Sequence, residues 1–286
     1  DKVLVYSSAM GDRVARRTEM SNELGQLLQR NVLHQAAGDE AGQLVLHYQP
    51  QLILDDLRLV GAEALLRWHH PRRGWVSPVE FIPVAEETGL IVPLGQWVLE
   101  QACHDALAWP DELRVAVNVS GRQLGDGQMV STVQQALAKS GLPAHRLELE
   151  ITETALMADP AHAREILMAL RRLGVSLALD DFGTGYSSLA YLATLPVDLV
   201  KIDRSFVQAM LRDKVVESVV VSIFQLCGNI GVSTLAEGIE SPEQAAMLRA
   251  HGCKLGQGFL YSKARPTQDI ACWRAVPRES QPLPCT

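Results

Sequence analysis

The chain lacks the long apolar run that a membrane-spanning helix requires. None of its hydrophobic stretches approaches the roughly 20 residues that cross a bilayer. It opens with Asp1 and not with a basic and then apolar leader, so we expect a soluble segment. Because the first residue is not Met, we also expect it to be excised from a longer protein, in which an upstream region anchors the chain to a membrane or senses a signal.

Cysteine is scarce and follows no pairing pattern. The five cysteines are odd in number and form neither a CxxC pair nor a regular spacing. This argues against a disulfide scaffold and against a structural zinc site. It favours a reducing compartment, and we expect a cytoplasmic location for this segment.

An excess of positive charge is also missing. The 26 Lys and Arg residues are outnumbered by 33 Asp and Glu residues, and the formal net charge is −7. Binding to a nucleic-acid duplex depends on clustered basic side chains, so we expect no such partner. A small anionic ligand held by metal ions is compatible with this balance. The hydrophobic fraction of 47% indicates an ordinary globular protein.

The N-terminal part differs in pattern from the rest. Residues 3–9 are predicted to form a strand and residues 11–33 a helix, because leucines recur there at helical spacing. The loop at residues 35–43 holds two glycines and two acidic residues and is the best candidate for a domain boundary. We therefore expect one domain to end near residue 36 and a larger one to begin at residue 37.

From residue 44 onward, short apolar runs rich in β-branched residues alternate with longer amphipathic stretches. We predict strands at residues 44–50, 59–66, 113–119, 146–152, 175–181, 197–203, 231–237 and 253–260. Helical patterning occupies residues 94–109, 128–140, 161–173, 215–230 and 242–251. Eight strands separated by helices predict an α/β fold of the TIM-like (β/α)8 barrel class.

Each predicted strand from the second onward carries a polar residue in its C-terminal part. These residues are Glu63, Asn118, Glu150, Asp180 with Asp181, Lys201, Glu237 and Gln257. In a barrel of parallel strands they converge on one face, which is where such folds hold their chemistry. The sequence therefore predicts a polar site at the mouth of the barrel.

Five carboxylates in one site repel each other and require a positive partner. Oxygen ligands from Asp, Glu and Asn suit Mg²⁺ or Mn²⁺, and the absence of His and Cys from the set argues against zinc or copper. Two ions roughly 3.5 to 4 Å apart would clamp the attacking and leaving oxygens of a phosphoester displacement. We expect a two-metal site.

The adjacent pair Asp180 and Asp181 needs a special geometry, because neighbouring residues on a regular strand point to opposite faces. Both reach one site only where the strand ends and the backbone turns. The following segment, residues 182–188, contains two glycines and small hydroxyl residues suited to a tight loop. Taken alone, the pair also fits a solvated turn.

Lys201 lies among Leu199, Val200 and Ile202, so we expect it to point into the barrel and not toward solvent. Three roles fit a lysine there: holding a nucleophilic water, neutralising a phosphate, or forming a Schiff base. The carboxylate cluster favours the first two.

The tripeptide Glu63-Ala64-Leu65 lies within a longer ordered set of motifs that resembles the EAL-domain cyclic di-GMP phosphodiesterases. The set comprises Tyr48-Gln49-Pro50, Phe81-Ile82-Pro83, Asn118-Val119-Ser120, Glu150-Ile151-Thr152-Glu153, Asp180 to Ser188, Lys201 to Ser205, Ala236-Glu237-Gly238 and Gln257-Gly258-Phe259-Leu260. It spans more than 200 residues and is far more specific than the tripeptide alone.

The resemblance implies a barrel whose first strand runs antiparallel to the others. It also implies hydrolysis of cyclic di-(3′,5′)-GMP to linear pGpG with two Mg²⁺ or Mn²⁺ ions, in bacterial signalling, with Ca²⁺ binding but not supporting turnover. The family domain would span residues 37–268, followed by a C-terminal tail at 269–286. Residues 1–36 resemble the end of a degenerate GGDEF-type domain, or else form a plain linker helix. A homodimer and an upstream regulatory or sensor domain are further implications.

Residue roles also follow from the resemblance. Glu63, Asn118, Glu150 and Asp180 match metal ligands, with Asp180 bridging, and Asp181 and Glu237 match positions that serve the second ion. Lys201 corresponds to the group that orients the attacking water, and Glu153 to the carboxylate that holds the loop after Asp181. Gln49, Arg67 and Gln257 match positions on the substrate side.

Two alternatives remain open at this point. A protein with the same motifs can act as a receptor that binds cyclic di-GMP without hydrolysing it. A Schiff-base aldolase that uses Lys201 is supported by fold analogy alone.

Overall fold

The structure is a computed structural model that describes residues 8–32, 42–183 and 192–273. The chain forms two compact units, one made of residues 1–45 and 66–98 and the other of residues 46–65 and 99–286. Among the described residues, no helix is both long enough and apolar enough to pass through a membrane.

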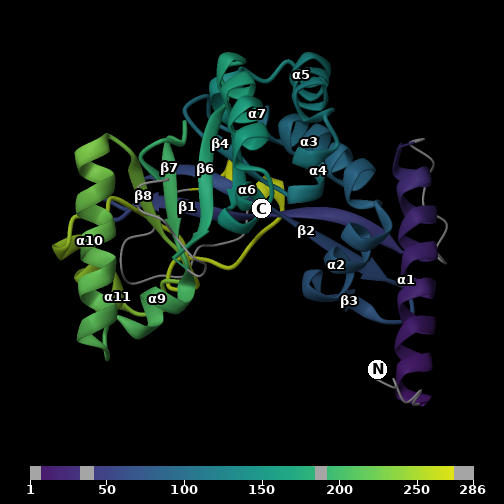
Figure 1. The fold of residues 1–286 in the computed structure, drawn as a ribbon, viewed down its shortest axis with the longest axis horizontal. Helices are drawn as coiled ribbons and strands as arrows, with labels where there is room; N and C mark the ends of the chain where they lie inside the picture. The colour runs from purple at the N-terminus through teal and green to yellow at the C-terminus, as the bar shows by residue number, and fades with distance from the viewer. Residues whose placement is uncertain (1–7, 33–41, 184–191, 274–286) are drawn as a thin grey trace. The chain divides into compact units, whose positions relative to one another are not determined.

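Eight strands close into a barrel, in the order β1, β9, β8, β7, β6, β5, β4, β2, with β2 pairing back to β1 (Figure 1). Their bounds are β1 (Gln43–Ile53), β2 (Leu59–His70), β4 (Arg114–Val119), β5 (Leu147–Thr152), β6 (Ser176–Phe182), β7 (Leu199–Ile202), β8 (Ser233–Ala236) and β9 (Leu255–Gly256). The barrel predicted from the strand and helix pattern is confirmed.

Strand β1 runs against the other seven, as the resemblance implies. It pairs antiparallel with β9, with Leu52 opposite Gly256, whereas β2, β4, β5, β6, β7, β8 and β9 pair parallel in succession. A short ninth strand, β3 (Gly74–Val76), pairs antiparallel with the end of β2 and was not predicted. The seven parallel strands therefore bring their C-terminal ends to one mouth.

The long helices lie close to their predicted positions. They are α3 (Ile91–Ala106), α5 (Met129–Ser140), α7 (Pro160–Arg172), α10 (Lys214–Ile230) and α11 (Pro242–Ala250). Helix α3 begins and ends three residues earlier than predicted, with Pro93 in its first turn, where a missing N–H costs no hydrogen bond.

The shorter helices were missed because two turns or fewer carry little periodicity. These are α4 (Gly121–Gly125), the 3-10 turn η1 (Ala144–Arg146), α6 (Glu153–Met157), α9 (Arg204–Ala209) and α12 (Thr267–Ala271). Helix α2 (Pro78–Thr88), although three turns long, was also missed, because Pro83 lies inside it.

Two predicted strands are corrected. Ser8 and Ala9, the end of the strand predicted at residues 3–9, belong to helix α1 (Ser8–Val32), and residues 3–7 lie outside the described part. The strand predicted at residues 253–260 stops at Gly256. Beyond it the chain turns onto Ile239, and a Cβ on Gly258 would lie 2.1 Å from the carbonyl oxygen of Ile239.

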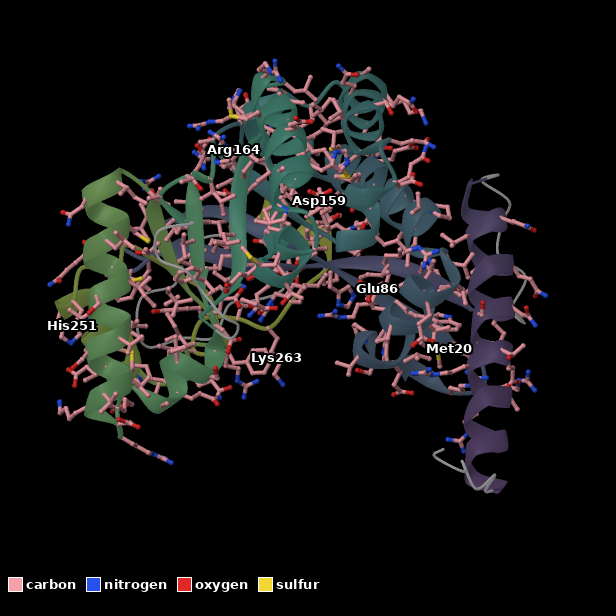
Figure 2. The ribbon with its side chains drawn as sticks, in the orientation of Figure 1. Met20, Glu86, Asp159, Arg164, His251 and Lys263 are labelled. Carbon is pink, nitrogen blue, oxygen red and sulfur yellow. The ribbon has the colours of Figure 1, made fainter. Side chains whose placement is uncertain are left out.

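The smaller unit has its own apolar cluster, to which α1 contributes one face. Leu24, Leu27 and Leu28 are buried there against Trp68 and Phe81. Met20 projects from the same helix toward α2 and β3 (Figure 2). Helix α1 is therefore part of the core of this unit.

Strand β5 is buried on both of its faces. Alternation along β5 buries Leu147, Leu149 and Ile151 on one face and Glu148 and Glu150 on the other.

Next to the barrel, α12 buries Ile270 and its Thr267 hydroxyl accepts a hydrogen bond from Trp109 Nε1 at 2.9 Å. The first residues of the predicted tail thus pack against the larger unit.

Candidate active site

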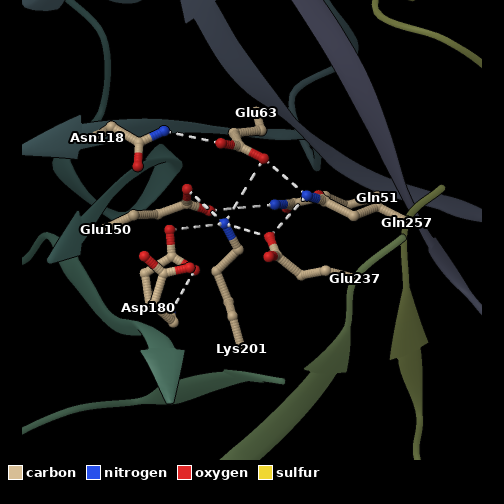
Figure 3. Close-up of polar contacts among 9 residues, drawn as sticks. Gln51, Glu63, Asn118, Glu150, Asp180, Lys201, Glu237 and Gln257 are labelled. Atoms are coloured by element: carbon tan, nitrogen blue, oxygen red, sulfur yellow. Dashed lines mark hydrogen bonds and ion pairs between the residues drawn. The ribbon is translucent and has the colours of Figure 1, made fainter. Parts of the chain in front are cut away.

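Lys201 lies at the centre of a group of buried carboxylates inside the barrel (Figure 3). Its side chain has no exposed surface, and its Nζ lies 2.7 Å from Glu150 Oε2 and 2.8 Å from Glu237 Oε1. Glu63 Oε2 and Asp180 Oδ2 are slightly further from it, at 3.5 and 3.4 Å. Four carboxylates, carried by β2, β5, β6 and the residue after β8, thus surround one ammonium group.

The register of the parallel strands brings these residues together. Asn118 on β4 is level with Glu150 on β5, and Thr152 on β5 is level with Asp180 on β6. Side chains from adjacent parallel strands at the same level point into the barrel together. Asn118 then donates from Nδ2 to Glu63 Oε1 across 2.7 Å.

Gln257 joins two of the carboxylates. Its Nε2 donates to Glu63 Oε2 at 2.7 Å and to Glu237 Oε1 at 2.9 Å. Its Oε1 is buried and has no hydrogen-bond partner among the residues that the structure describes. An acceptor atom without a partner in a buried polar site is typical of a place where a water, ion or ligand binds.

Asp180 and Asp181 both reach the site because the strand is irregular there. The register between β6 and β7 shifts between Leu179 and Phe182, and Asp181 has a left-handed backbone with φ of 54°. Outside glycine, aspartate is one of the residues that best tolerate this conformation, and such strain is found at functional sites. This bend lets both aspartates face the site, although adjacent residues of a regular strand point to opposite faces.

In the described part of the chain, one lysine faces four carboxylates in the site. Burial would lower the pKa of Lys201, but the four surrounding carboxylates outweigh it and raise that pKa well above its usual range. Burial and then the neighbouring Glu63 raise the pKa of Glu150 well above its usual range, although Lys201 opposes this. Burial chiefly raises the pKa of Glu237, to about 8. Both shifts favour the protonated carboxyl, so one lysine does not keep all four carboxylates ionised.

Glu63 and Asp181 respond differently to this environment. Burial would raise the pKa of Glu63, but Lys201 and the hydrogen bonds from Gln257 and Asn118 outweigh it and lower that pKa. Burial, followed by the charge of Asp180, raises the pKa of Asp181. The groups around Glu63 thus favour its ionised form.

The donor set fits a divalent cation with a preference for oxygen ligands. Asp180, Asp181 and Glu237 each offer an oxygen, and these atoms lie within 4.8 Å of one another. Carboxylate and amide oxygens suit Mg²⁺, Mn²⁺ or Ca²⁺. The uncompensated negative charge and the unpartnered Gln257 oxygen point to the same kind of ligand.

Other residues predicted for the site lie around it or elsewhere. Gln49 lies on β1, two residues before the buried Gln51 and hence on the same face of the strand. Glu153 is buried at the start of α6, and the loop it is expected to hold includes residues 184–191, which are outside the described part. Arg67 belongs to the smaller unit, where its Nη1 donates to Leu66 O at 3.0 Å.

Sequence reasoning missed Gln51. This residue is buried, and its Nε2 donates to Glu150 Oε1 at 3.4 Å. It was overlooked because the predicted first strand ended at residue 50, whereas β1 continues to Ile53. The signal was present: alternation places Gln51 on the same face as Gln49.

Comparisons with known proteins agree with this geometry. The model of the EAL domain family matches residues 30–264. The cyclic di-GMP phosphodiesterase NbdA of Pseudomonas aeruginosa is 46% identical over 82% of this chain and 30% of its own length. An uncharacterised signalling protein of Caulobacter vibrioides is 40% identical over 94% of this chain and 32% of its own length.

The solved structure of the PaMucR phosphodiesterase in complex with c-di-GMP is also similar. It superposes with a TM-score of 0.79 at 38% identity, covering 87% of this chain and 99% of that one. The chain spans about a third of the length of the curated relatives it matches.

Proposed function

This chain belongs to the EAL domain family, and from that premise we propose that it hydrolyses cyclic di-(3′,5′)-GMP to linear pGpG in bacterial second-messenger signalling. The observation that carries the proposal is the convergence of Glu63, Glu150, Asp180 and Glu237 on Lys201 at the mouth of the barrel. The names of a relative and of a solved neighbour support the substrate.

Two Mg²⁺ or Mn²⁺ ions complete the proposed site. Glu63, Asn118, Glu150 and Asp180 would hold the first, and Asp181 and Glu237 the second, with Asp180 shared between them. Bound there, such ions activate a water and stabilise the negative charge that develops on the phosphate oxygens. Ca²⁺ fits the same oxygen donors and is expected to bind without supporting turnover.

Lys201 contributes a fixed positive charge. The surrounding carboxylates keep it protonated by raising its pKa, so it acts as a hydrogen-bond donor toward them and toward an attacking water. A Schiff base requires a neutral amine. The same environment therefore argues against the aldolase alternative.

Substrate contacts are assigned to Gln49, Arg67 and Gln257. In Gln257, the Nε2 is engaged with Glu63 and Glu237, which leaves Oε1 to accept a hydrogen bond from a hydroxyl or a guanine N–H. The guanidinium of Arg67 suits a phosphate or a guanine edge. Glu153 is assigned to holding the loop after Asp181.

The proposal extends to the protein as a whole. Because the relatives are about three times longer, an upstream regulatory or sensor domain is expected to precede α1. The proposed assembly is a homodimer. The proposed location of this segment is the cytoplasm, with membrane anchoring through an upstream region.

The test is to incubate the purified chain with cyclic di-GMP and Mg²⁺ or Mn²⁺ and to separate the products by chromatography. We expect pGpG with either ion and intact substrate with Ca²⁺. Tight binding without pGpG, in a folded sample with both activating ions, would overturn the enzymatic proposal in favour of a receptor.

A further inference from the structure

Gln51 is the buried amide beside the carboxylate cluster that has no assigned role. We propose that it is a positioning residue for the metal centre, whose Nε2 holds Glu150 in the orientation needed to bind an ion. The inference rests on the proposed function for the presence of that centre.

The geometry fixes Glu150 from two sides. Lys201 Nζ lies 2.7 Å from its Oε2, and Gln51 Nε2 lies 3.4 Å from its Oε1. Figure 3 shows Gln51 extending toward Glu150 from the side of the barrel opposite Asp180. A carboxylate offers about four lone-pair positions, so these two donors leave capacity for an ion.

The backbone around Gln51 is anchored on both sides. Before it, the backbones of Tyr48 and Arg265 exchange two hydrogen bonds, of 2.6 and 2.9 Å. After it, Leu54 N donates to Lys254 O at 2.9 Å, and Leu54 packs where a Cβ on Gly256 would lie. The amide of Gln51 therefore extends from a fixed base.

A neutral amide suits this place better than a charged group. A second cation would compete with the metal ions, and another carboxylate would add to the repulsion within the cluster. Gln51 on β1 and Gln257, directly after the paired strand β9, together contact three carboxylates, namely Glu150, Glu63 and Glu237. Two amides thus orient three ligands while leaving their charge available to metal ions.

The test compares Gln51→Met with Gln244→Met. Methionine preserves the length of the side chain and removes the donor. Gln244 on α11 is a matched control because it is also buried and its Nε2 also donates at 3.4 Å, to Val207 O on α9. Mn²⁺ affinity is measured by calorimetry, and kcat and KM are measured with cyclic di-GMP.

For Gln51→Met we expect Mn²⁺ binding to weaken by about tenfold or more, as is typical when a partner of a metal ligand is removed. We also expect kcat to fall while KM changes by less than about twofold. Gln244→Met should alter thermal stability alone. Mn²⁺ affinity and kcat that both stay within about twofold of wild type in Gln51→Met would overturn the proposal.

Gln51→Leu replaces Gln51→Met if the latter does not fold. If neither variant folds while Gln244→Met does, Gln51 has a folding role and the positioning role is wrong. The calorimetric measurement needs no turnover. A wild-type chain that binds Mn²⁺ without hydrolysing cyclic di-GMP would therefore contradict the proposed function and still test Gln51, whereas absence of Mn²⁺ binding would overturn both.

Discussion

Lys201 and Glu150 form a fully buried ion pair, with 2.7 Å between Nζ and Oε2 and no exposed surface on either side chain. Taking two charges out of water is costly unless each has close partners. Here the lysine has four acidic partners, whereas the four carboxylates share one positive charge.

Replacing Glu63 by Gln should abolish most of the turnover and leave the fold intact. Lys201, Gln257 and Asn118 favour the ionised form of Glu63, and Gln keeps its shape without its charge. We expect kcat/KM for cyclic di-GMP to fall more than about a hundredfold. Mutating a residue that only contacts a metal ligand already lowers metal affinity or activity by about 10 to 100-fold. Glu165→Gln, on the exposed side of α7, is the control and should leave kcat/KM unchanged. Turnover above a tenth of wild type in Glu63→Gln would exclude Glu63 as a ligand.

Replacing Lys201 by Met should destabilise the metal-free protein. In EDTA we expect the free energy of unfolding to fall by about 3 to 5 kcal/mol, as for the removal of one partner of a buried pair. Mn²⁺ should restore part of the loss, because it replaces the missing positive charge. Denaturant titrations with EDTA and with Mn²⁺ measure both effects.

Lys139→Met is the matched control for that experiment. Lys139 pairs with Glu100 at 2.6 Å on the surface, where an ion pair contributes about 0 to 1 kcal/mol. If Lys201→Met were no less stable than Lys139→Met in EDTA, the buried lysine would not be neutralising the carboxylates.

Tyr48 should make stability fall at alkaline pH. Its hydroxyl donates to Asp105 Oδ2 at 2.7 Å, and burial, followed by the charge of Asp105, raises its pKa far above the usual value near 10. The unfolded chain therefore loses this proton first, and stability that is fully present below pH 10 declines as the pH rises further. The slope for this group is about 1.4 kcal/mol per pH unit. Tyr48→Phe should lack this part of the slope between pH 10 and 11, and equal slopes in both proteins would contradict the assignment.

Leu27→Ala should destabilise the smaller unit. Leu27 is buried in the cluster that joins α1 to Trp68 and Phe81, and such truncations cost about 2 to 5 kcal/mol. Leu107→Ala, at a half-exposed position, should change stability by less than about 0.5 kcal/mol. Hydrogen exchange of α2 amides reports the effect locally. Unchanged exchange in Leu27→Ala would show that α1 does not stabilise this unit.

Much of the barrel was predictable because its signals are local. Each parallel strand is a short apolar run, and the polar residue at its end stands out, as Glu150 does beyond Leu149. Long amphipathic helices such as α7 and α10 follow from periodicity alone. The antiparallel direction of β1, in contrast, depends on pairing with β9, more than 200 residues away, and came from the resemblance.

The parts that were missed depend on contacts between distant residues. Gln51 lies one residue beyond the predicted first strand, and its contact with Glu150 on β5 depends on the closure of the barrel. The end of β9 at Gly256 depends on Ile239, whose backbone forms hydrogen bonds with Gln257 and Leu260 just beyond the strand. The bend that turns Asp181 into the site requires the register shift between β6 and β7, for which the sequence offers only the glycines that follow.

The measurement that tests the central claim most directly is anomalous X-ray diffraction from crystals of the chain soaked in Mn²⁺. The account predicts two manganese peaks at the mouth of the barrel, with Asp180 contacting both and Glu63, Glu150 and Glu237 each contacting one. Absence of a peak in the barrel, or peaks bound only by carboxylates outside this group, would contradict it.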